Sequence, residues 1–193
     1  MERMRANGDD DLCILLEKAR NGDRDAFKSI VSLYQKKIFL LAYAFLRNRE
    51  DALDVVQETF MRLYQKMDAF NSERNFQAWL LQIARNLAID YYRKHHSRRR
   101  DMEVGTSLED VRPAAEAGSS EAHSSDLRQA FSRCLEKLAE RQRTIFVLKH
   151  YNGLQYKEIA QILNISEGTV KSLHFKAVRN MRKLLSPQLG MEP

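Results

Sequence analysis

Hydroxyl and cationic side chains recur along one side of the stretch from Tyr156 to Leu185. Groups of this kind bind base edges and phosphates, but here they supply no paired nucleophile and base and no set of metal ligands. The chemistry that they predict is recognition of a polyanion rather than catalysis. The residues in this pattern are Thr169, Lys171, Ser172, Lys176 and Arg179.

Two short helices joined by a tight turn are expected to position these side chains. The apolar period ends at Leu163 and resumes at Val170, and Asn164 tolerates the left-handed conformation of a sharp corner. Ser166 lies where an N-cap belongs. This pattern favours a helix-turn-helix whose second helix enters a DNA major groove over an ordinary helical hairpin with a solvated basic face. The candidate DNA contacts also include Tyr156, Lys157, Ser166 and Glu167.

A second polar surface is predicted on a helix from about Phe76 to His96. Its exposed side carries Arg85, Asn86 and Arg93, and the segment ends in "YYRKHHSRRR". Cations, an amide and aromatic rings interleaved on one face suit contacts to phosphates and base edges and stacking on unpaired bases. We therefore expect this helix to contact nucleic acid as well.

A third polar row lies on the helix predicted to begin at Asn48. The spacing of its apolar residues leaves one face polar, and taken alone such a row indicates a solvated helix face. The row comprises Asp51, Asp54, Gln57, Glu58 and Arg62.

Charge is distributed unevenly along the 193 residues, whose formal net charge is +6. Residues 85–100 carry six basic side chains against one acidic one, whereas residues 101–125 carry six acidic ones against Arg112. Residues 126–193 are basic again, with twelve cations against six acids. Two basic regions that flank an acidic one favour a polyanion bound at two places, because each neutralised phosphate releases counterions.

No grouping of residues predicts catalysis, a metal or a cofactor. The sequence contains no cluster of metal-binding carboxylates, no paired nucleophile and base, and no glycine-rich phosphate loop. Cys13 and Cys134 are far apart among apolar positions, and we expect both to be buried thiols. No signal peptide or segment of membrane-spanning length is apparent, so the expected location is the cytoplasm, without membrane insertion.

Helical periodicity and the scarcity of Gly (7 residues) and Pro (3 residues) predict an all-α protein with two small domains. Residues 1–10 are expected to be disordered, and residues 11–96 to form the first domain. Residues 97–125 lack an apolar period and read as a flexible acidic linker. Residues 126–186 form the helix-turn-helix domain, and residues 187–193 form a tail.

Three motifs, in order, resemble those of bacterial RNA polymerase sigma factors of the extracytoplasmic-function group: "DALDVVQETFMRLY", "FQAWLLQIARNLAIDYYRK" and "LKHYNGLQYKEIAQILNISEGTVKS". The resemblance covers about residues 10–96 and 126–186. It implies no enzymatic activity and no cofactor. The implied partners are core RNA polymerase, promoter DNA and an anti-sigma factor.

The resemblance gives the polar row a role, because the family's matching helix docks on a coiled coil of the largest polymerase subunit. It implies core contacts for Asp54, Gln57 and Glu58, with Asp51, Arg62 and Leu63 beside them. The family's matching loop captures a flipped base of the −10 element, and the helix after it reads the element's upstream end. The implied −10 residues are Phe70, Asn71, Ser72, Arg85, Asn86 and Arg93, while the helix-turn-helix domain resembles the reader of the −35 element.

Two adjacent positions depart from the family pattern. Leu173 stands where the family commonly has arginine, and His174 stands where it commonly has an apolar residue. The departure leaves Lys171 as the main cation on the reading face. We expect His174 to be partly buried and its replacement by leucine to be tolerated.

Two other protein classes stay open from the sequence alone. A two-domain transcriptional activator would need an N-terminal sensing domain, but the strand–helix alternation of such receivers is missing. A nuclease would need the site features whose lack is described above. Binding to purified core polymerase separates a sigma factor from both.

Overall fold

The computed structural model describes residues 3–71, 75–96 and 130–186. Within these ranges the regular structure is helical and contains no strand, which confirms the predicted all-α class. The chain divides into two compact units, Met1–Arg99 (unit 1) and Arg100–Pro193 (unit 2).

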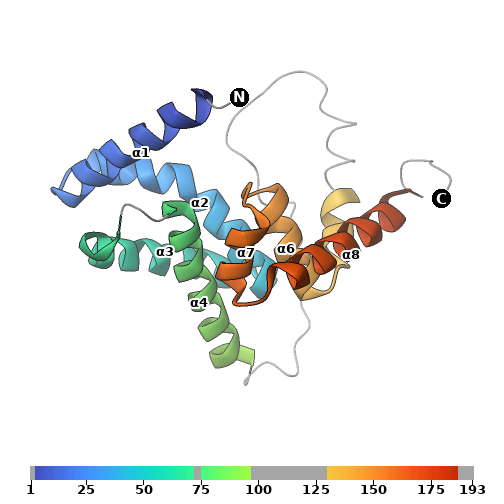
Figure 1. Ribbon diagram of the computed structural model, residues 1–193. Helices are drawn as coiled ribbons and strands as arrows, with labels where there is room; N and C mark the ends of the chain where they lie inside the picture. The colour runs from blue at the N-terminus through green and yellow to red at the C-terminus, as the bar shows by residue number, and fades with distance from the viewer. Residues whose placement is uncertain (1–2, 72–74, 97–129, 187–193) are drawn as a thin grey trace, which may run out of the picture. The chain divides into compact units, whose positions relative to one another are not determined.

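The helices of each unit follow one another with short connections (Figure 1). Unit 1 contains α1 (Arg3–Arg20), α2 (Arg24–Leu46), α3 (Arg49–Lys66), the 3₁₀ helix η1 (Met67–Ala69) and α4 (Phe76–His96). Unit 2 contains a helical segment at residues 130–136, followed by α6 (Glu140–His150), α7 (Tyr156–Leu163) and α8 (Glu167–Leu185).

The N-terminal segment differs from the sequence-based expectation. Residues 3–10, expected to be disordered, form the first turns of α1. The segment has no proline, and its Arg, Met and Ala residues favour helix. The predicted linker at 97–125 and the predicted tail at 187–193 lie outside the described residues.

Cap residues set the helix boundaries of unit 1, including the predicted start at Asn48. Gly22 adopts a φ of 88° after α1. Asp23 Oδ1 accepts hydrogen bonds from the backbone N–H groups of Asp25 and Ala26 at 2.9 and 3.1 Å and so begins α2. The Ala26 bond, followed by the Asp25 bond, lowers the pKa of the Asp23 carboxyl. Asn48 begins α3 by accepting from Asp51 N at 3.0 Å.

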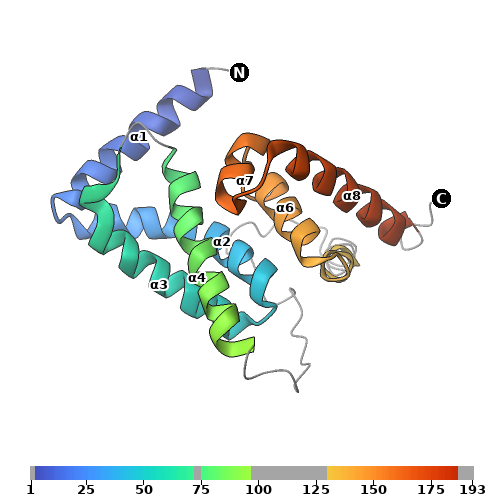
Figure 2. The same ribbon diagram turned by 60° about the horizontal axis from the view of Figure 1, so that its bottom comes forward.

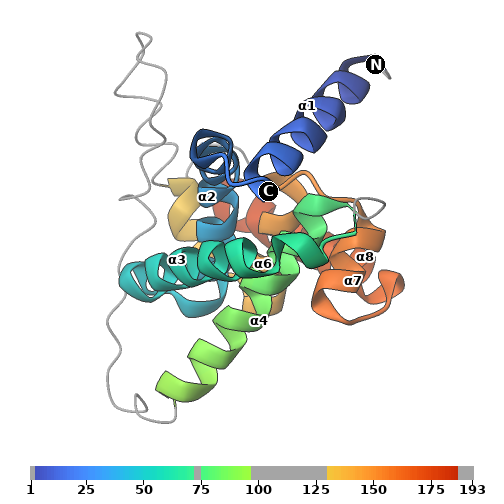
Figure 3. The same ribbon diagram turned by 90° about the vertical axis from the view of Figure 1, so that its left-hand side faces the viewer.

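The core of unit 1 lies between α2, α3 and α4, and Figure 3 shows α4 crossing α3 obliquely. Ile30, Leu41, Leu63 and Leu80 are fully buried there. By length and composition α2 could span a membrane, contrary to the expectation that no segment reaches that length. Its apolar residues instead pack in this core, which explains its composition.

The core of unit 2 joins α6, α7 and α8, which Figure 2 shows as a closely packed group. Ile145, Ile159, Val170 and Ala177 are fully buried between them. Asn180 Nδ2 also donates to Gln142 Oε1 at 3.0 Å, which ties the second half of α8 to α6. The recognition helix is therefore fixed along its length rather than only at the turn.

The two cysteines occupy different environments. Cys134 is buried as expected, and burial raises the pKa of its thiol. Cys13 is exposed, so the expectation of a second buried thiol was wrong. Leu16 and Ala19 form the buried side of α1. At 3.6 residues per turn, position 13 lies about 60° around the helix from Leu16 and about 120° from Ala19, which turns it away from that side.

Candidate nucleic-acid interface

The turn between α7 and α8 is built from backbone hydrogen bonds. Asn164 adopts a left-handed φ of 54°, and Ile165 N donates to Ala160 O at 3.1 Å to close α7. Ser166 Oγ accepts from Thr169 N at 3.1 Å and begins α8. These contacts confirm the predicted turn residue and N-cap. Ser166 is thereby engaged in the cap.

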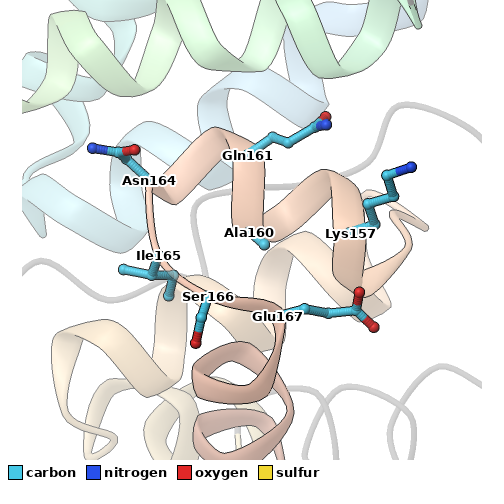
Figure 4. Close-up of a pocket in the computed structure, with 7 residues that line it drawn as sticks. All are labelled: Lys157, Ala160, Gln161, Asn164, Ile165, Ser166 and Glu167. Atoms are coloured by element: carbon cyan, nitrogen blue, oxygen red, sulfur yellow. The ribbon is translucent and has the colours of Figure 1, made fainter.

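A shallow groove runs along the outside of this turn (Figure 4). Figure 4 shows Lys157 and Glu167 at one end of the groove and Asn164 at the other. Lys157 and Glu167 are exposed, whereas Tyr156, at the start of α7, is half-buried. The remaining lining residues are Ala160, Gln161, Ile165 and Ser166.

The outer side of α8 presents all five side chains that the sequence pattern selected. Val170, Ala177 and Met181 are buried on the opposite side. Lys171 Nζ lies 2.7 Å from Glu167 Oε1, and this hydrogen bond raises the pKa of Lys171, so the side chain stays cationic. The exposed set is Thr169, Lys171, Ser172, Lys176 and Arg179.

Sequence reasoning missed Phe175 on the same helix. Its side chain is 67% exposed, although it is a large aromatic residue. It follows Lys171 by four positions and Ser172 by three, which places all three on one helix face. That spacing was the signal that could have identified it.

His174 lies on the flank of α8, in a hydrogen-bonded chain that the sequence did not predict. Tyr156 Oη and His174 Nδ1 are 3.0 Å apart, and His174 Nε2 lies 2.9 Å from His150 Nε2. His174 is half-buried, as expected, and Leu173 is half-buried beside it. Burial, then the charges of His150 and Lys149, lower the pKa of His174.

The polar row on α3 divides by exposure. Asp54 and Gln57 are exposed, whereas Asp51, Glu58 and Arg62 are half-buried. Arg62 Nε donates to Glu58 Oε1 at 3.0 Å, and Tyr91 on α4 donates its hydroxyl to Asp54 Oδ2 at 2.9 Å. Two acidic residues of the row, Asp54 and Glu58, therefore already accept hydrogen bonds within unit 1.

Beside that row, α3 exposes apolar side chains that sequence reasoning missed. Leu53, Met61 and Tyr64 are 46%, 54% and 66% exposed. With Gln57 they fall on one face at helical spacing. Leu63, which the resemblance placed beside the docking residues, is fully buried and faces the core.

The outer side of α4 brings its predicted −10 residues together. Arg85 Nη1 donates to Asn86 Oδ1 at 3.1 Å, and Asn86 and Arg93 are exposed. Partial burial, then the charge of Arg93, lower the pKa of Arg85. A cation and an amide are thus held side by side.

The loop before α4 is anchored at both described ends. At its start, Arg20 Nη2 donates to Met67 O at 2.9 Å and to Phe70 O at 3.0 Å. At its end, Asn75 Oδ1 accepts from Ala78 N at 2.9 Å. Asn71 is exposed, and Ser72 lies outside the described residues.

Phe70 itself is buried. Its ring centroid lies 5.2 Å from that of Phe76 and 4.9 Å from that of Trp79. This placement corrects the expectation of a direct DNA contact to an anchoring position, because an aromatic ring in this setting contributes most by packing. Trp79 is half-buried against it.

Comparison with known proteins adds two family matches. The model for Sigma-70 region 2 matches residues 30–98, and the model for Sigma-70, region 4 matches residues 128–181. Each match falls within one of the two units.

Within the described residues, no group of three or more His, Cys, Asp or Glu could hold a metal ion.

Similar proteins and structures extend over most of the chain. The ECF RNA polymerase sigma factor SigW of Bacillus subtilis is 35% identical over 176 residues, which are 88% of this chain and 94% of SigW. The ECF RNA polymerase sigma-E factor of Haemophilus influenzae is 32% identical over 183 residues, 90% of this chain and 94% of that protein.

Among solved structures, the sigma factor RpoE of Bartonella quintana, in complex with the anti-sigma factor NepR, is 27% identical with a TM-score of 0.68. The match covers 83% of this chain and 96% of RpoE. CnrH, in complex with the cytosolic domain of CnrY, is 26% identical with a TM-score of 0.62 and covers 90% of this chain and 96% of CnrH. With both sigma regions matched and relatives above 30% identity along nearly their whole length, this chain belongs to the ECF family of RNA polymerase sigma factors.

Proposed function

We propose that this sigma factor divides its work among three surfaces: α3 binds core polymerase, α4 and the loop before it read the −10 element, and α8 reads the −35 element. Family membership establishes that the protein directs RNA polymerase to specific promoters for initiation. The observation that carries the finer assignment is that each matched region exposes its own polar or mixed face.

The docking surface on α3 combines an apolar strip with a charged rim. Interfaces commonly place apolar and aromatic side chains at the centre and polar ones around them. The exposed strip supplies the centre, and the Glu58–Arg62 pair supplies part of the rim. The surface comprises Asp51, Leu53, Asp54, Gln57, Glu58, Met61, Arg62 and Tyr64.

The −10 surface combines an amide and cations on α4 with an anchored loop. Asn86 can hydrogen-bond to a base edge, while Arg85 and Arg93 suit phosphates. Holding both loop ends reduces the entropy lost when an extruded base is bound, and unstacking that base costs a few kcal/mol. Asn71 and Ser72 are the proposed loop contacts, with Phe70 and Arg20 as positioning residues.

The −35 surface is the outer side of α8. Its first turns carry Thr169, Lys171 and Ser172, and the N-terminal part of a recognition helix is the part that contacts base edges. Lys176, Arg179 and Phe175 extend the same surface, with the cations suited to phosphates. Tyr156, Lys157 and Glu167 border it from the turn.

An anti-sigma factor is the remaining proposed partner. RpoE of Bartonella quintana is bound to the anti-sigma factor NepR in the structure described above, and CnrH is bound to the cytosolic domain of CnrY. A partner of this kind would hold the chain away from polymerase in the cytoplasm, where promoter DNA is transcribed. The chain itself is not an enzyme under this proposal.

Reconstituted transcription tests the assignment. The full chain is added to purified core polymerase, and promoters are identified from the transcripts that its overexpression induces. We expect specific transcripts that depend on both elements, with separate losses for α3, α4 and α8 variants. Initiation that persists after either promoter element is scrambled would contradict the division of tasks.

A further inference from the structure

A chain of three aromatic polar side chains connects all three helices of the helix-turn-helix group. His150 is the last residue of α6, Tyr156 the first of α7, and His174 lies midway along α8. His174 contacts the other two through its two ring nitrogens, at 3.0 Å to Tyr156 Oη and 2.9 Å to His150 Nε2.

Ring stacking and cations hold this chain in place. The rings of His150 and His174 stack with centroids 5.1 Å apart, and the ring centroid of Phe146 lies 4.3 Å from that of His150. Lys149 Nζ lies 4.8 Å from the centre of the Tyr156 ring and donates to Leu154 O at 3.1 Å, which closes the turn from α6 to α7. These contacts restrict the position of the Tyr156 ring independently of its hydrogen bond to His174.

We propose that Tyr156, His174 and His150 form a clasp that holds α8 at the angle needed to read the −35 element, with His174 as the positioning residue. The inference rests on the proposed role of α8. His174 lies three positions after Lys171 and two after Ser172, so a rotation of α8 at the clasp moves these side chains directly. An apolar residue at position 174 could pack there but could not join α6 to α7.

The clasp depends on the protonation states of His150 and His174, whereas apolar packing would not. With both histidines neutral, each contact pairs one donor with one acceptor in either tautomer, and one added proton can still be accommodated. Protonating both rings leaves two N–H groups facing each other and two like charges at 2.9 Å. The clasp therefore opens when both histidines are charged.

The charged groups around the clasp favour its neutral form. Burial, then Lys149, lower the pKa of His150 from 6.5, and His174 is lowered by burial, His150 and Lys149. Lys171 on α8 faces the Tyr156 ring at 6.0 Å and is paired with Glu167. Since the folded imidazoles take up protons less readily, their stabilisation is complete above pH 6.5 and declines as the pH falls through the lowered values.

The test measures transcription by full-length chain with core polymerase on promoters that differ by single −35 base pairs. Tyr156→Phe removes only the hydroxyl and keeps the ring beside Lys149. We expect the preference for the cognate −35 sequence to fall about two- to tenfold, the factor represented by one neutral hydrogen bond. His174→Leu, which the family pattern alone predicts to be tolerated, should under this proposal lose at least as much, because leucine makes neither hydrogen bond. Ser186→Ala, which removes a hydroxyl elsewhere in unit 2, should change nothing.

A second arm uses proton dependence. His174→Gln keeps a hydrogen-bonding side chain that does not titrate, so it should retain more preference than His174→Leu. As the pH falls from about 7.5 to about 5.5, through the lowered histidine values, the wild type should lose −35 preference more steeply than His174→Gln, relative to a promoter with a scrambled −35 element measured at each pH.

The outcomes separate the clasp from the role of α8. Suppose that Lys171→Ala changes the −35 preference, whereas Tyr156→Phe and His174→Leu leave it unchanged or lower transcription from all promoters equally. The clasp proposal is then wrong, and α8 remains the proposed reader of the −35 element. If Lys171→Ala also has no effect on preference, the proposed −35 surface fails. Identical pH profiles for wild type and His174→Gln would overturn the proton-dependent part.

Discussion

The two units build their proposed DNA-facing surfaces in different ways. In unit 2 the proposed reading residues lie on one continuous helix, α8, behind a local turn and cap. In unit 1 the proposed −10 surface is assembled from α4, the loop before it and Arg20 on α1, which contacts carbonyls 47 and 50 residues away. Unit 2 should therefore be sensitive to changes in helix angle, and unit 1 to loss of distant anchors.

The largest effect is expected outside both DNA surfaces, on α3. Replacing Leu53 and Met61 by alanine removes the exposed apolar strip that we propose as the centre of the docking surface. Core binding should weaken by about 2 kcal/mol or more, as for interface hot spots. A pull-down titration against core polymerase measures this, and helicity should be unchanged.

Asp54→Ala combined with Glu58→Ala should weaken core binding less, because these residues form the rim. Asp54 also accepts a hydrogen bond from Tyr91, so Tyr91→Phe is the matched control that breaks this link and leaves the α3 face intact. Wild-type affinity in the double variant would remove the rim from the docking surface.

Lys171→Ala should change the preference at one −35 base pair by about 1–3 kcal/mol while core binding is unchanged. The measurement is promoter activity across single-base variants. A uniform loss, with a salt slope lower by about one, would instead place Lys171 on a phosphate and leave base reading to Thr169 and Ser172.

Asn86→Ala should change the sequence preference at one base pair at the upstream end of the −10 element, while binding to core polymerase is retained. Its amide is held by Arg85, so the variant also releases that guanidinium, and the loss should be somewhat below that for Lys171 at a single base pair. Open-complex formation on promoter variants measures it. Equal losses on all promoters would make Asn86 a structural residue.

Arg20→Lys tests the distant anchor of unit 1. Lysine keeps the charge but lacks the guanidinium geometry that reaches both carbonyls, so open complexes should decrease by about two- to tenfold. Lys18→Ala, a change in the same last turn of α1, is the control. If −35 variants were affected instead, Arg20 would not act through the loop.

The smallest effect distinguishes the two thiols. Cys13→Ser should change the free energy of unfolding by no more than about 0.5 kcal/mol, because the side chain is exposed. Cys134→Ser should cost about 1–3 kcal/mol, since it places a hydroxyl in an apolar core. A thiol reagent should label Cys13 in the native protein and Cys134 only after unfolding.

Features that depend on neighbours three or four residues apart could be predicted from the sequence alone. The caps at Asp23, Asn48 and Ser166 and the left-handed Asn164 follow from local hydrogen bonding. The same short-range periodicity predicted the exposed face of α8. These features, with the order of the motifs, determined the fold class and the family.

Only the tertiary structure decided which side chains from separate helices meet. It buried Phe70 and Leu63, exposed Cys13 and the apolar strip on α3, and joined Arg20 to the loop before α4. It also placed His174 between Tyr156 and His150, residues 18 and 24 positions away. Helical spacing fixes the direction of a side chain around its own axis, but its partner on another helix depends on how the helices pack.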